Sequence, residues 1–403
     1  MNVTNYIKQN GLEKLKEEFH ISVKEYEDRY VLNYDQIDSP RFHPVVDECR
    51  GLILDKNLNI MCRSFHRFFN FGEGIEGNKF GVKDSEGKFH AFDIKDAKIY
   101  HKMDGTLINI YWDYFNNKWQ VSTRGMAFAE GGNEFFDAFE DLAKNAKQYK
   151  DIVSYLEEIT VYFPGCIEYT YIFELTSPYN RIVTPYTETE LCLLSGKHNN
   201  LGTEFTRKEL EQFSKNCKVP LPKYYEINDW NDLTNLVNEF PSMQEGVVLV
   251  WEDSMRPYGH YRLKCKNVQY VAIHNLRSNG MISPYRILTL VMANEHEEYL
   301  QYFEEDRKYF DFVESEYDKF LINIETLYNK LKDIELQKDF ALAVMEEIPE
   351  KFYSGFLFDM RKRKTLKECL DKFEGNGKKL AKMMRLKEKF MKEFNLKIEI
   401  EEE

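Results

Sequence analysis

A Lys-Met-Asp-Gly turn at residues 102–105 stands between two strand-like segments, and this arrangement constrains the fold more than any other feature of the chain. The two segments, residues 97–101 and 106–112, contain the β-branched and aromatic residues that strands prefer. A further turn leads to a third such segment, residues 118–123. The pattern predicts strands on both sides of the turn, with Lys102 at the end of the first strand.

Three further sets of charged residues follow in order along the chain, each beside or within a strand-like segment. Glu174 lies in an aromatic run, and Glu245 immediately precedes an apolar run. Lys264 and Lys266 lie two residues apart on another strand-like segment. Because side chains alternate across a strand, these two lysines are predicted to share a face.

Each motif taken singly has an ordinary structural explanation. Asp-Gly is a common turn dipeptide, so residues 102–105 alone are typical of a hairpin turn. Lysines usually lie on surfaces, so Lys264 and Lys266 alone fit a solvated strand face. Glu174 alone fits a strand-edge carboxylate facing water. The four motifs in this order rarely occur together by chance, and together they favour one shared site.

A lysine ahead of an Asp-Gly turn is the way in which nucleotidyltransferases present an amine to the α-phosphate of a nucleotide. The amine must first lose its proton, yet a free lysine has a pKa of about 10.4. We expect Arg50, Lys264, Lys266 and a bound Mg²⁺ to lower the pKa of Lys102 and to attract a triphosphate.

Carboxylates and glycines supply the other parts of such a site. Glu174 and Glu245 suit a metal ion or the ribose hydroxyls, because carboxylates bind Mg²⁺ and accept hydrogen bonds. Gly105 and Gly246 are expected to let the backbone approach the nucleotide closely.

The composition fits a two-domain protein with a substantial core. The chain has 403 residues, of which 43% are hydrophobic, and its seven cysteines form no Cys-x-x-Cys pair, which argues against a disulfide framework or a structural zinc site. It contains neither an apolar run long enough for a membrane span nor a secretory leader pattern, so a cytoplasmic location is expected. Helical patterns replace strands after Ser283-Pro284, so we expect domains at residues 1–280 and 281–403.

Two upstream segments and one later segment carry a resemblance to a known family. They are Asp47-Glu48-Cys49-Arg50-Gly51, Arg67-Phe68-Phe69-Asn70 and Asn180-Arg181-Ile182-Val183. With the four motifs above, the chain resembles the covalent nucleotidyltransferases, namely ATP-dependent ligases and mRNA capping enzymes, and within them the phage-type RNA ligase 1 family. The resemblance covers roughly residues 28 to 300.

This resemblance implies an α+β fold: an N-terminal nucleotidyltransferase domain of the ATP-grasp-like ligase type with antiparallel sheets, followed by an all-α domain. It implies that Lys102 is the adenylated nucleophile and that Tyr270 is needed for ligation. The implied catalytic residues are Lys102, Glu174, Lys264, Lys266 and Tyr270. The implied nucleotide contacts are Tyr34, Arg50, Arg67, Phe69, Lys102, Asp104, Gly105, Arg124, Glu174, Glu245, Gly246, Lys264 and Lys266, and the implied metal ligands are Glu174, Glu245 and Glu297.

Two of these positions depart from the family pattern. Position 67 is Arg where the family typically has Lys, and a guanidinium is not equivalent to an ammonium in phosphate geometry. Glu297 stands where the family has an aspartate linked to a metal.

The resemblance implies an ATP-dependent RNA ligase that joins RNA 5′-phosphate and 3′-hydroxyl ends through lysyl-AMP and an adenylated RNA end, in RNA repair with nicked tRNA as one candidate substrate. Mg²⁺ is the expected ion, with Mn²⁺ as an alternative, and a monomer is expected. One competing hypothesis is a GTP-dependent capping guanylyltransferase, although helices rather than a β-rich OB domain follow the paired lysines. The other is a non-catalytic RNA-binding protein on the same fold.

The C-terminal third is strongly polarised in charge. Residues 295–350 carry 17 acidic and 6 basic side chains, whereas residues 351–397 carry 15 basic and 6 acidic ones. We hypothesise that the basic segment, including Arg361-Lys362-Arg363-Lys364 and the lysines of residues 378–382, holds RNA phosphates. The alternative is that these lysines pair with the neighbouring acidic helices or lie on a solvated face.

Overall fold

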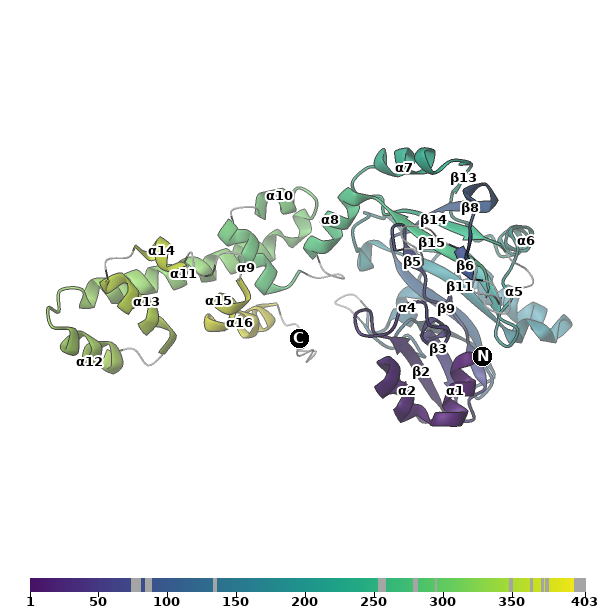
Figure 1. Cartoon of the computed structure of the whole chain (residues 1–403), viewed down its shortest axis with the longest axis horizontal. Coiled ribbons are helices and arrows are strands. Elements are labelled where there is room, and N and C mark those ends of the chain that lie inside the picture. Colours follow the sequence, from purple (N-terminus) through teal and green to yellow (C-terminus); the bar gives the residue numbers. More distant parts are fainter. Residues whose placement is uncertain are drawn as a thin grey trace. The chain divides into compact units, whose positions relative to one another are not determined.

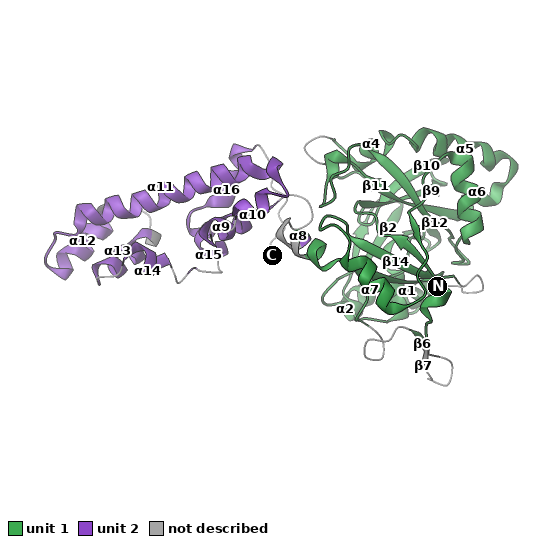
Figure 2. Cartoon of the chain, turned by 90° about the horizontal axis from the view of Figure 1, so that it is seen from above, with its two compact units in different colours: residues 1–273 green, residues 274–403 purple. Residues whose placement is uncertain are grey.

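The computed structural model describes residues 1–73, 81–83, 89–132, 136–252, 259–277, 282–293, 296–347, 351–362, 365–370, 373 and 377–394. The chain divides into two compact units, residues 1–273 and residues 274–403 (Figure 2). The boundary expected after residue 280 falls within residues 278–281, which lie outside the described residues. None of the described helices combines the length and the apolar character that crossing a membrane requires.

Unit 1 contains three larger sheets and one small one, with helices packed around them (Figure 1). The first sheet has the order β1-β2-β3-β4 and is antiparallel throughout. Its apolar face packs against three helices at the N-terminus, and Gly11, with a φ of 86°, separates the first two of them. The bounds are α1 (Asn2–Asn10), α2 (Leu12–Phe19), β1 (Ile21–Glu25), β2 (Arg29–Tyr34), α3 (Pro44–Glu48), β3 (Arg50–Asp55) and β4 (Ile60–Cys62).

The second sheet has the order β10-β9-β11-β12 and is also antiparallel. Its core includes residues of the helices that follow β10 and of the helix that follows β12. The bounds are β9 (Thr106–Asp113), β10 (Lys118–Thr123), α4 (Phe139–Lys144), α5 (Tyr149–Tyr162), η2 (Pro164–Glu168), β11 (Tyr169–Thr176), η3 (Pro178–Asn180), β12 (Glu190–His198) and α6 (Arg207–Cys217).

The third sheet has the order β13-β8-β14-β15-β5, and the short edge strand β5 pairs in parallel with β15. Apolar residues of helix α7 form one core with residues of this sheet. The bounds are β5 (Phe69–Asn70), η1 (Ile94–Asp96), β8 (Ala97–His101), β13 (Tyr224–Tyr225), α7 (Trp230–Asn238), β14 (Gly246–Trp251) and β15 (Tyr261–Lys266), and a separate pair is formed by β6 (Gly81–Lys83) and β7 (Phe89–Ala91).

The strands on either side of the Lys102 turn are present as predicted, but they do not pair with each other. Strand β8 belongs to the third sheet and β9 to the second, so the turn carries the chain from one sheet to the other. The hairpin explanation for this turn is therefore wrong. Lys102 stands where the two sheets meet.

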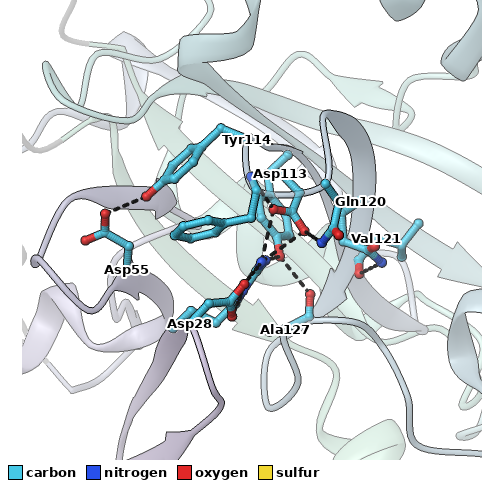
Figure 3. Close-up of polar contacts among 11 residues, drawn as sticks. Asp28, Asp55, Asp113, Tyr114, Gln120, Val121 and Ala127 are labelled. Atoms are coloured by element: carbon cyan, nitrogen blue, oxygen red, sulfur yellow. Dashed lines mark hydrogen bonds and ion pairs between the residues drawn. The ribbon is translucent and has the colours of Figure 1, made fainter.

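A buried ionic cluster joins the first sheet to the second (Figure 3). The Arg29 guanidinium, on β2, donates to both carboxylate oxygens of Asp113, on β9, at 3.0 Å. It also donates to the hydroxyl of Tyr111 at 2.7 Å and to Asp28 at 2.6 Å. This cluster holds the first sheet against the strand that follows the Lys102 turn.

Unit 2 is helical throughout its described residues, which agrees with the expected all-α region. Helix α8 begins within unit 1 and ends within unit 2. The bounds are α8 (Val268–Arg277), α9 (Pro284–Ala293), α10 (His296–Leu300), η4 (Glu304–Asp306), α11 (Arg307–Leu331), α12 (Gln337–Glu347), α13 (Lys351–Arg361), α14 (Leu366–Leu370), α15 (Gly377–Met383) and α16 (Leu386–Glu393).

Candidate active site

A cavity of about 250 Å³ is lined by strands of both the second and the third sheets. Four of the predicted site residues line it, namely Arg50, Lys102, Gly105 and Glu174. The sheets therefore bring together, around one space, residues that lie far apart in the sequence.

Lys102 forms an ion pair across the end of the third sheet. Its backbone N–H donates to the carbonyl of Gly246 at 2.9 Å, and its Nζ lies 2.6 Å from one oxygen of Glu245. The Nζ of Lys266 lies 2.8 Å from the other oxygen of Glu245. Glu245 therefore bridges Lys102 and Lys266, which confirms the predicted proximity of the turn lysine to this strand lysine.

The predicted lowering of the Lys102 pKa is wrong for the protein without a nucleotide. Burial lowers this pKa, but the attraction of Glu245 and Glu174 outweighs burial and raises it above its ordinary value. The repulsion between cations falls instead on Lys264, because burial and the charges of Arg50, Lys102 and Lys266 lower its pKa to about 7. Lys102 is thus an ammonium that must lose its proton before it can attack a phosphate.

Glu174 is a partly buried carboxylate in the middle of the second sheet. It stands opposite Leu107 on β9 and opposite Cys192 on β12. Burial raises its pKa to about 7, although Lys102 and Arg50 act in the opposite direction. It has no hydrogen-bond partner among the described residues, so its oxygens remain available to a ligand.

Arg50 and Lys264 both lie near the ring of Phe68, which lines the cavity. The Arg50 guanidinium carbon is 5.3 Å, and the Lys264 Nζ 5.1 Å, from the centroid of this ring. Burial and the charge of Arg124 lower the pKa of Arg50 to about 10, so it stays charged at neutral pH. Its Nη1 is buried and has no hydrogen-bond partner among the described residues, which suits the binding of an anionic group.

The ring of Tyr34 lies near two guanidinium groups. Those of Arg67 and Arg124 are 4.3 Å and 4.6 Å from its ring centroid, and that of Arg67 is 5.5 Å from the ring of Phe69. Arg67 also donates to three backbone carbonyls, those of Gln36, Ser39 and Pro40, at 3.2 to 3.4 Å. In this state Arg67 therefore holds the loop after β2.

Asp104 is a buried acceptor for protein groups. One carboxylate oxygen accepts the hydroxyl of Tyr270 at 2.6 Å, and the other accepts the backbone N–H groups of Val183 and Thr184 at 2.9 Å and 2.6 Å. Its own N–H donates to the hydroxyl of Tyr186 at 3.1 Å. Asp104 is only 3% exposed, so its contacts fix the shape of the turn that carries Lys102.

The segment from Asn180 to Tyr186 is a part of the site to which the sequence assigned no role. In addition to the bonds to Asp104, the Asn180 amide donates to Thr106 at 2.7 Å, and the Thr184 hydroxyl donates to the carbonyl of Met243 at 2.6 Å. The segment thus ties the Lys102 turn to the chain that leads into Glu245. The Asn-Arg-Ile-Val motif was the available signal, but its partners become visible only in the fold.

Close packing within the protein itself requires both Gly105 and Gly246, and their expected approach to the nucleotide stays a prediction. A Cβ at Gly105 would overlap the carbonyl oxygen of Leu175, and a Cβ at Gly246 would overlap that of Cys265. Gly246 also has a φ of 139°, a conformation that residues with side chains rarely adopt. Both glycines therefore permit close approach between backbone segments of the protein itself.

The implied metal ligands differ in the partners that they have within their own unit. Glu245 is occupied by two lysines, and Glu297 lies in unit 2, where it pairs with Arg307 at 3.1 Å. No group of three or more His, Cys, Asp or Glu side chains suited to a metal is present among the described residues. Glu174 alone offers a carboxylate without a hydrogen-bond partner among these described ligands.

Comparison with known proteins places the chain in a family. Residues 48–270, more than half of the chain, match a family model described as RNA ligase. The chain belongs to the phage-type RNA ligase 1 family. The resemblance drawn from the motifs is thereby confirmed.

Two curated relatives and one solved structure are similar to this chain. A candidate bifunctional polynucleotide kinase/RNA ligase of Autographa californica nuclear polyhedrosis virus is 33% identical over 75% of this chain, and the match spans only 42% of that relative. An RNA ligase of Rhodothermus phage RM378 is 24% identical over 74% of this chain and 78% of its own length. An archaeal ATP-dependent RNA ligase structure has a TM-score of 0.43 and 12% identity, covering 78% of this chain and 79% of that one.

Proposed function

We propose that this RNA ligase family member is an ATP-dependent RNA ligase that seals RNA 5′-phosphate and 3′-hydroxyl ends through a lysyl-AMP intermediate. The observation that carries the proposal is the position of Lys102. It lines a cavity with Arg50 and Glu174, and it lies within an ionic cluster that includes Lys266.

The residues divide the chemistry among themselves. The Lys102 amine attacks the α-phosphorus of ATP, a P–N bond forms, and the bond to pyrophosphate breaks. The adenylate then passes to an RNA 5′-phosphate, and attack by an RNA 3′-hydroxyl releases AMP. Arg50, Lys264 and Lys266 offset the negative charge of the phosphates, and Glu245 holds the Lys102 ammonium until it gives up its proton.

A divalent ion fits the site through Glu174. Mg²⁺ commonly binds through one or two carboxylates together with substrate phosphates, rather than in an all-protein cage. Glu174 has the free oxygens for this role, with Mg²⁺ as the expected ion and Mn²⁺ as an alternative. When bound, the ion would offset charge on the phosphates.

Unit 2 is proposed to help hold the RNA, through a basic surface formed by exposed residues of α15 and α16 and of the junction between them. These exposed residues are Lys378, Lys382, Arg385 and Lys392. Lys389 instead pairs with Glu316 of α11 at 2.7 Å, which matches the competing explanation for that one residue. Arg363 and Lys364 lie outside the described residues.

A charge-reversed variant tests this RNA contact. Lys378→Glu with Lys382→Glu is expected to weaken RNA binding and to flatten its dependence on salt. An unchanged salt slope would remove unit 2 from the RNA interface. Because the relatives come from a virus and a phage, we extend the proposal to RNA repair in the cytoplasm of an infected cell, with nicked tRNA as one candidate substrate.

One labelling experiment tests the proposed activity. The protein is incubated with Mg²⁺ and α-labelled ATP or GTP, denatured, and examined for covalent label. Label from ATP that disappears in Lys102→Arg, followed by sealing of a 5′-phosphorylated RNA, supports the ligase. Label from GTP alone would indicate a capping enzyme, and no label from either nucleotide would indicate a non-catalytic protein.

A further inference from the structure

A buried ionic cluster around Glu204 joins the second sheet to the third. The Arg262 guanidinium, on β15 of the third sheet, donates to both carboxylate oxygens of Glu204, at 3.0 Å and 2.5 Å. From β12 of the second sheet, the Ser195 hydroxyl donates to the same carboxylate at 3.0 Å, and the Lys197 Nζ lies 3.4 Å from it. Glu204 also forms a β-bridge with Lys197. Its carboxylate therefore links a strand of one sheet to a strand of the other.

Burial makes this link rigid. Lys197 is fully buried, Glu204 is 6% exposed, and the Arg262 side chain is 7% exposed. Burial raises the pKa of Glu204, but the charges of Arg262 and Lys197 outweigh burial and lower this pKa to about 2, so the carboxylate is ionised. A fully paired polar network of this kind rigidifies the groups that it joins. The cluster is therefore a fixed point between the sheets.

The proposed reaction gives Arg262 no role, although this residue lines the cavity. Its guanidinium carbon lies 4.0 Å from the ring centroid of Phe65, and its two terminal nitrogens donate to Glu204. An arginine held by both contacts has little capacity left for a ligand. Its influence on the chemistry would therefore pass along the strand that carries it.

Arg262 shares a strand face with the two lysines of β15, Lys264 and Lys266. The residues that alternate with these three belong to the core that the sheet shares with α7, and side chains alternate across a strand. Since a strand rises about 3.3 Å per residue, Arg262 lies about 7 Å from Lys264 along β15 and about 13 Å from Lys266. The Glu204 cluster thus lies one side-chain position away from Lys264 on this face.

Strand β15 is held on both sides of Lys264. On one side, Lys266 pairs with Glu245, which directly precedes β14 of the same sheet. On the other side, Arg262 pairs with Glu204 and is thereby joined to the second sheet, which forms another wall of the cavity. This second contact therefore fixes Lys264 relative to that wall.

The geometry points to Glu204 as a positioning residue that, through Arg262, holds Lys264 in place for the phosphates of a bound nucleotide. This inference rests on the proposed function, because it assumes that the phosphates of ATP meet Lys264. A shift of about 1 Å in such a group weakens its contacts, since charged hydrogen bonds depend steeply on distance. The inference predicts that loss of the Glu204 charge weakens the binding of ATP but not of adenosine, which has no phosphate.

The test measures nucleotide binding separately from catalysis. Affinities for ATP and for adenosine are determined without divalent metal, for the unaltered protein, for Glu204→Gln, for Arg262→Gln and for the double variant. Glu204→Gln is expected to bind ATP about 10-fold more weakly, the lower value of a hydrogen bond to a charged group, and to bind adenosine as before. Because Glu204 acts through Arg262, the double variant should lose no more affinity than the larger of the two single losses.

Asp113→Asn is the matched control. It removes the charge of another buried carboxylate that joins two sheets, the partner of Arg29, and neither residue is among the described residues that line the cavity. This variant is expected to bind both ligands as the unaltered protein does. Urea unfolding shows whether each variant is folded under the binding conditions.

A second variant keeps the test decisive if Glu204→Gln does not fold. Arg262→Lys keeps the positive charge beside Glu204 but loses one of the two hydrogen bonds to its carboxylate. It should weaken ATP binding about 3-fold and leave adenosine binding unchanged.

Failure of this inference can be told apart from failure of the proposed function. An equal loss for both ligands, no loss of ATP affinity, losses that add in the double variant, or the same loss in Asp113→Asn would overturn the inference. A loss confined to ATP, in a protein that ATP never labels, would support the inference and overturn the ligase proposal. Absence of binding of either ligand to the unaltered protein would overturn both.

Discussion

Two of the ionic clusters described in unit 1 differ in one respect. In the cluster around Arg29, the guanidinium is fully buried, and it pairs with Asp113, Asp28 and Tyr111 (Figure 3). In the cluster around Lys102, Arg50 has an unpaired buried nitrogen. In the same cluster, burial and the neighbouring cations lower the pKa of Lys264.

The difference shows how the same residue types serve structure or chemistry. A buried charge whose hydrogen bonds are all made contributes rigidity and has nothing left for a ligand. A cluster with excess positive charge and unpaired hydrogen-bond donors is destabilising by itself. Such a cluster favours the binding of a polyanion that supplies the missing negative charge and hydrogen-bond acceptors. The Arg29 cluster therefore predicts effects on stability, and the Lys102 cluster predicts effects on nucleotide chemistry.

The largest expected effect comes from removing the nucleophile. Lys102→Ala should reduce covalent labelling by ATP at least about 10⁴-fold, as the loss of a nucleophile does in other covalent enzymes. Glu245 keeps its bond to Lys266, so the free energy of unfolding of unit 1 should differ from that of the unaltered protein by less than about 1 kcal/mol. Labelling and urea unfolding measure the two quantities, and label retained in the variant would contradict the assignment.

For the Arg29 cluster we expect the opposite pattern, a loss of stability without a loss of labelling. Asp113→Asn leaves Arg29 buried with its charge only partly offset by Asp28, and should lower the free energy of unfolding by about 3 kcal/mol. The four tryptophans all lie in unit 1, so their fluorescence follows this unit in urea. The control Lys24→Ala breaks an exposed pair with Glu130 and should cost less than about 1 kcal/mol.

Covalent labelling by ATP per folded molecule should not change in Asp113→Asn, because this residue belongs to the Arg29 cluster. A variant that keeps its stability but loses labelling would reverse the roles given to the two clusters.

The sequence predicted much of the Lys102 cluster and little of the Arg29 cluster. Lys102, Glu174, Lys264 and Lys266 stand in short motifs, and strand alternation placed the two later lysines on one face, so local patterns sufficed to group them. Arg29 and Asp113 carry no motif, and only the fold brings together these two residues, which are 84 positions apart.

Two features of the site could not be predicted from short sequence motifs, because they depend on residues far away in the sequence. The direction of the Lys102 pKa depends on Glu245, 143 residues away, whose carboxylate the sequence suggested for a metal or ribose. The role of Asp104 depends on backbone N–H groups of the Asn180 segment and on Tyr270. Hydrogen-bond partners of this kind are set by tertiary packing, which spacing does not reveal.

An effect of intermediate size is expected for the pH dependence of nucleotide binding by the Lys102 cluster. Because the pKa of Lys264 is about 7, this amine is largely neutral above that pH in the free protein. The phosphates of ATP favour its charged form, so binding takes up a proton, and affinity should fall by up to about 10-fold per pH unit above pH 7. Calorimetry at pH 8 in buffers of different ionisation enthalpy measures this uptake.

Lys264→Met should reduce this pH dependence without removing it. Glu174, whose pKa is also about 7, gains negative charge over the same range and contributes a slope of the same sign. Arg50 and Lys102, which also act on Lys264, keep their charge through this range because their pKa values lie well above it. The same proton uptake in the variant and in the unaltered protein would show that Lys264 does not face the phosphates.

The smallest expected effect tests whether fully paired hydrogen bonds, like those of the Arg29 cluster, also support the Lys102 cluster. Tyr270→Phe removes one of the three hydrogen bonds to the Asp104 carboxylate, and should slow single-turnover labelling of Lys102 about 3- to 10-fold with ATP affinity unchanged. The control Tyr299→Phe removes a matched bond to Asp306 within unit 2 and should leave the rate unchanged. If Tyr270→Phe instead spared labelling and slowed only the joining of adenylated RNA, Tyr270 would act on the RNA rather than through Asp104.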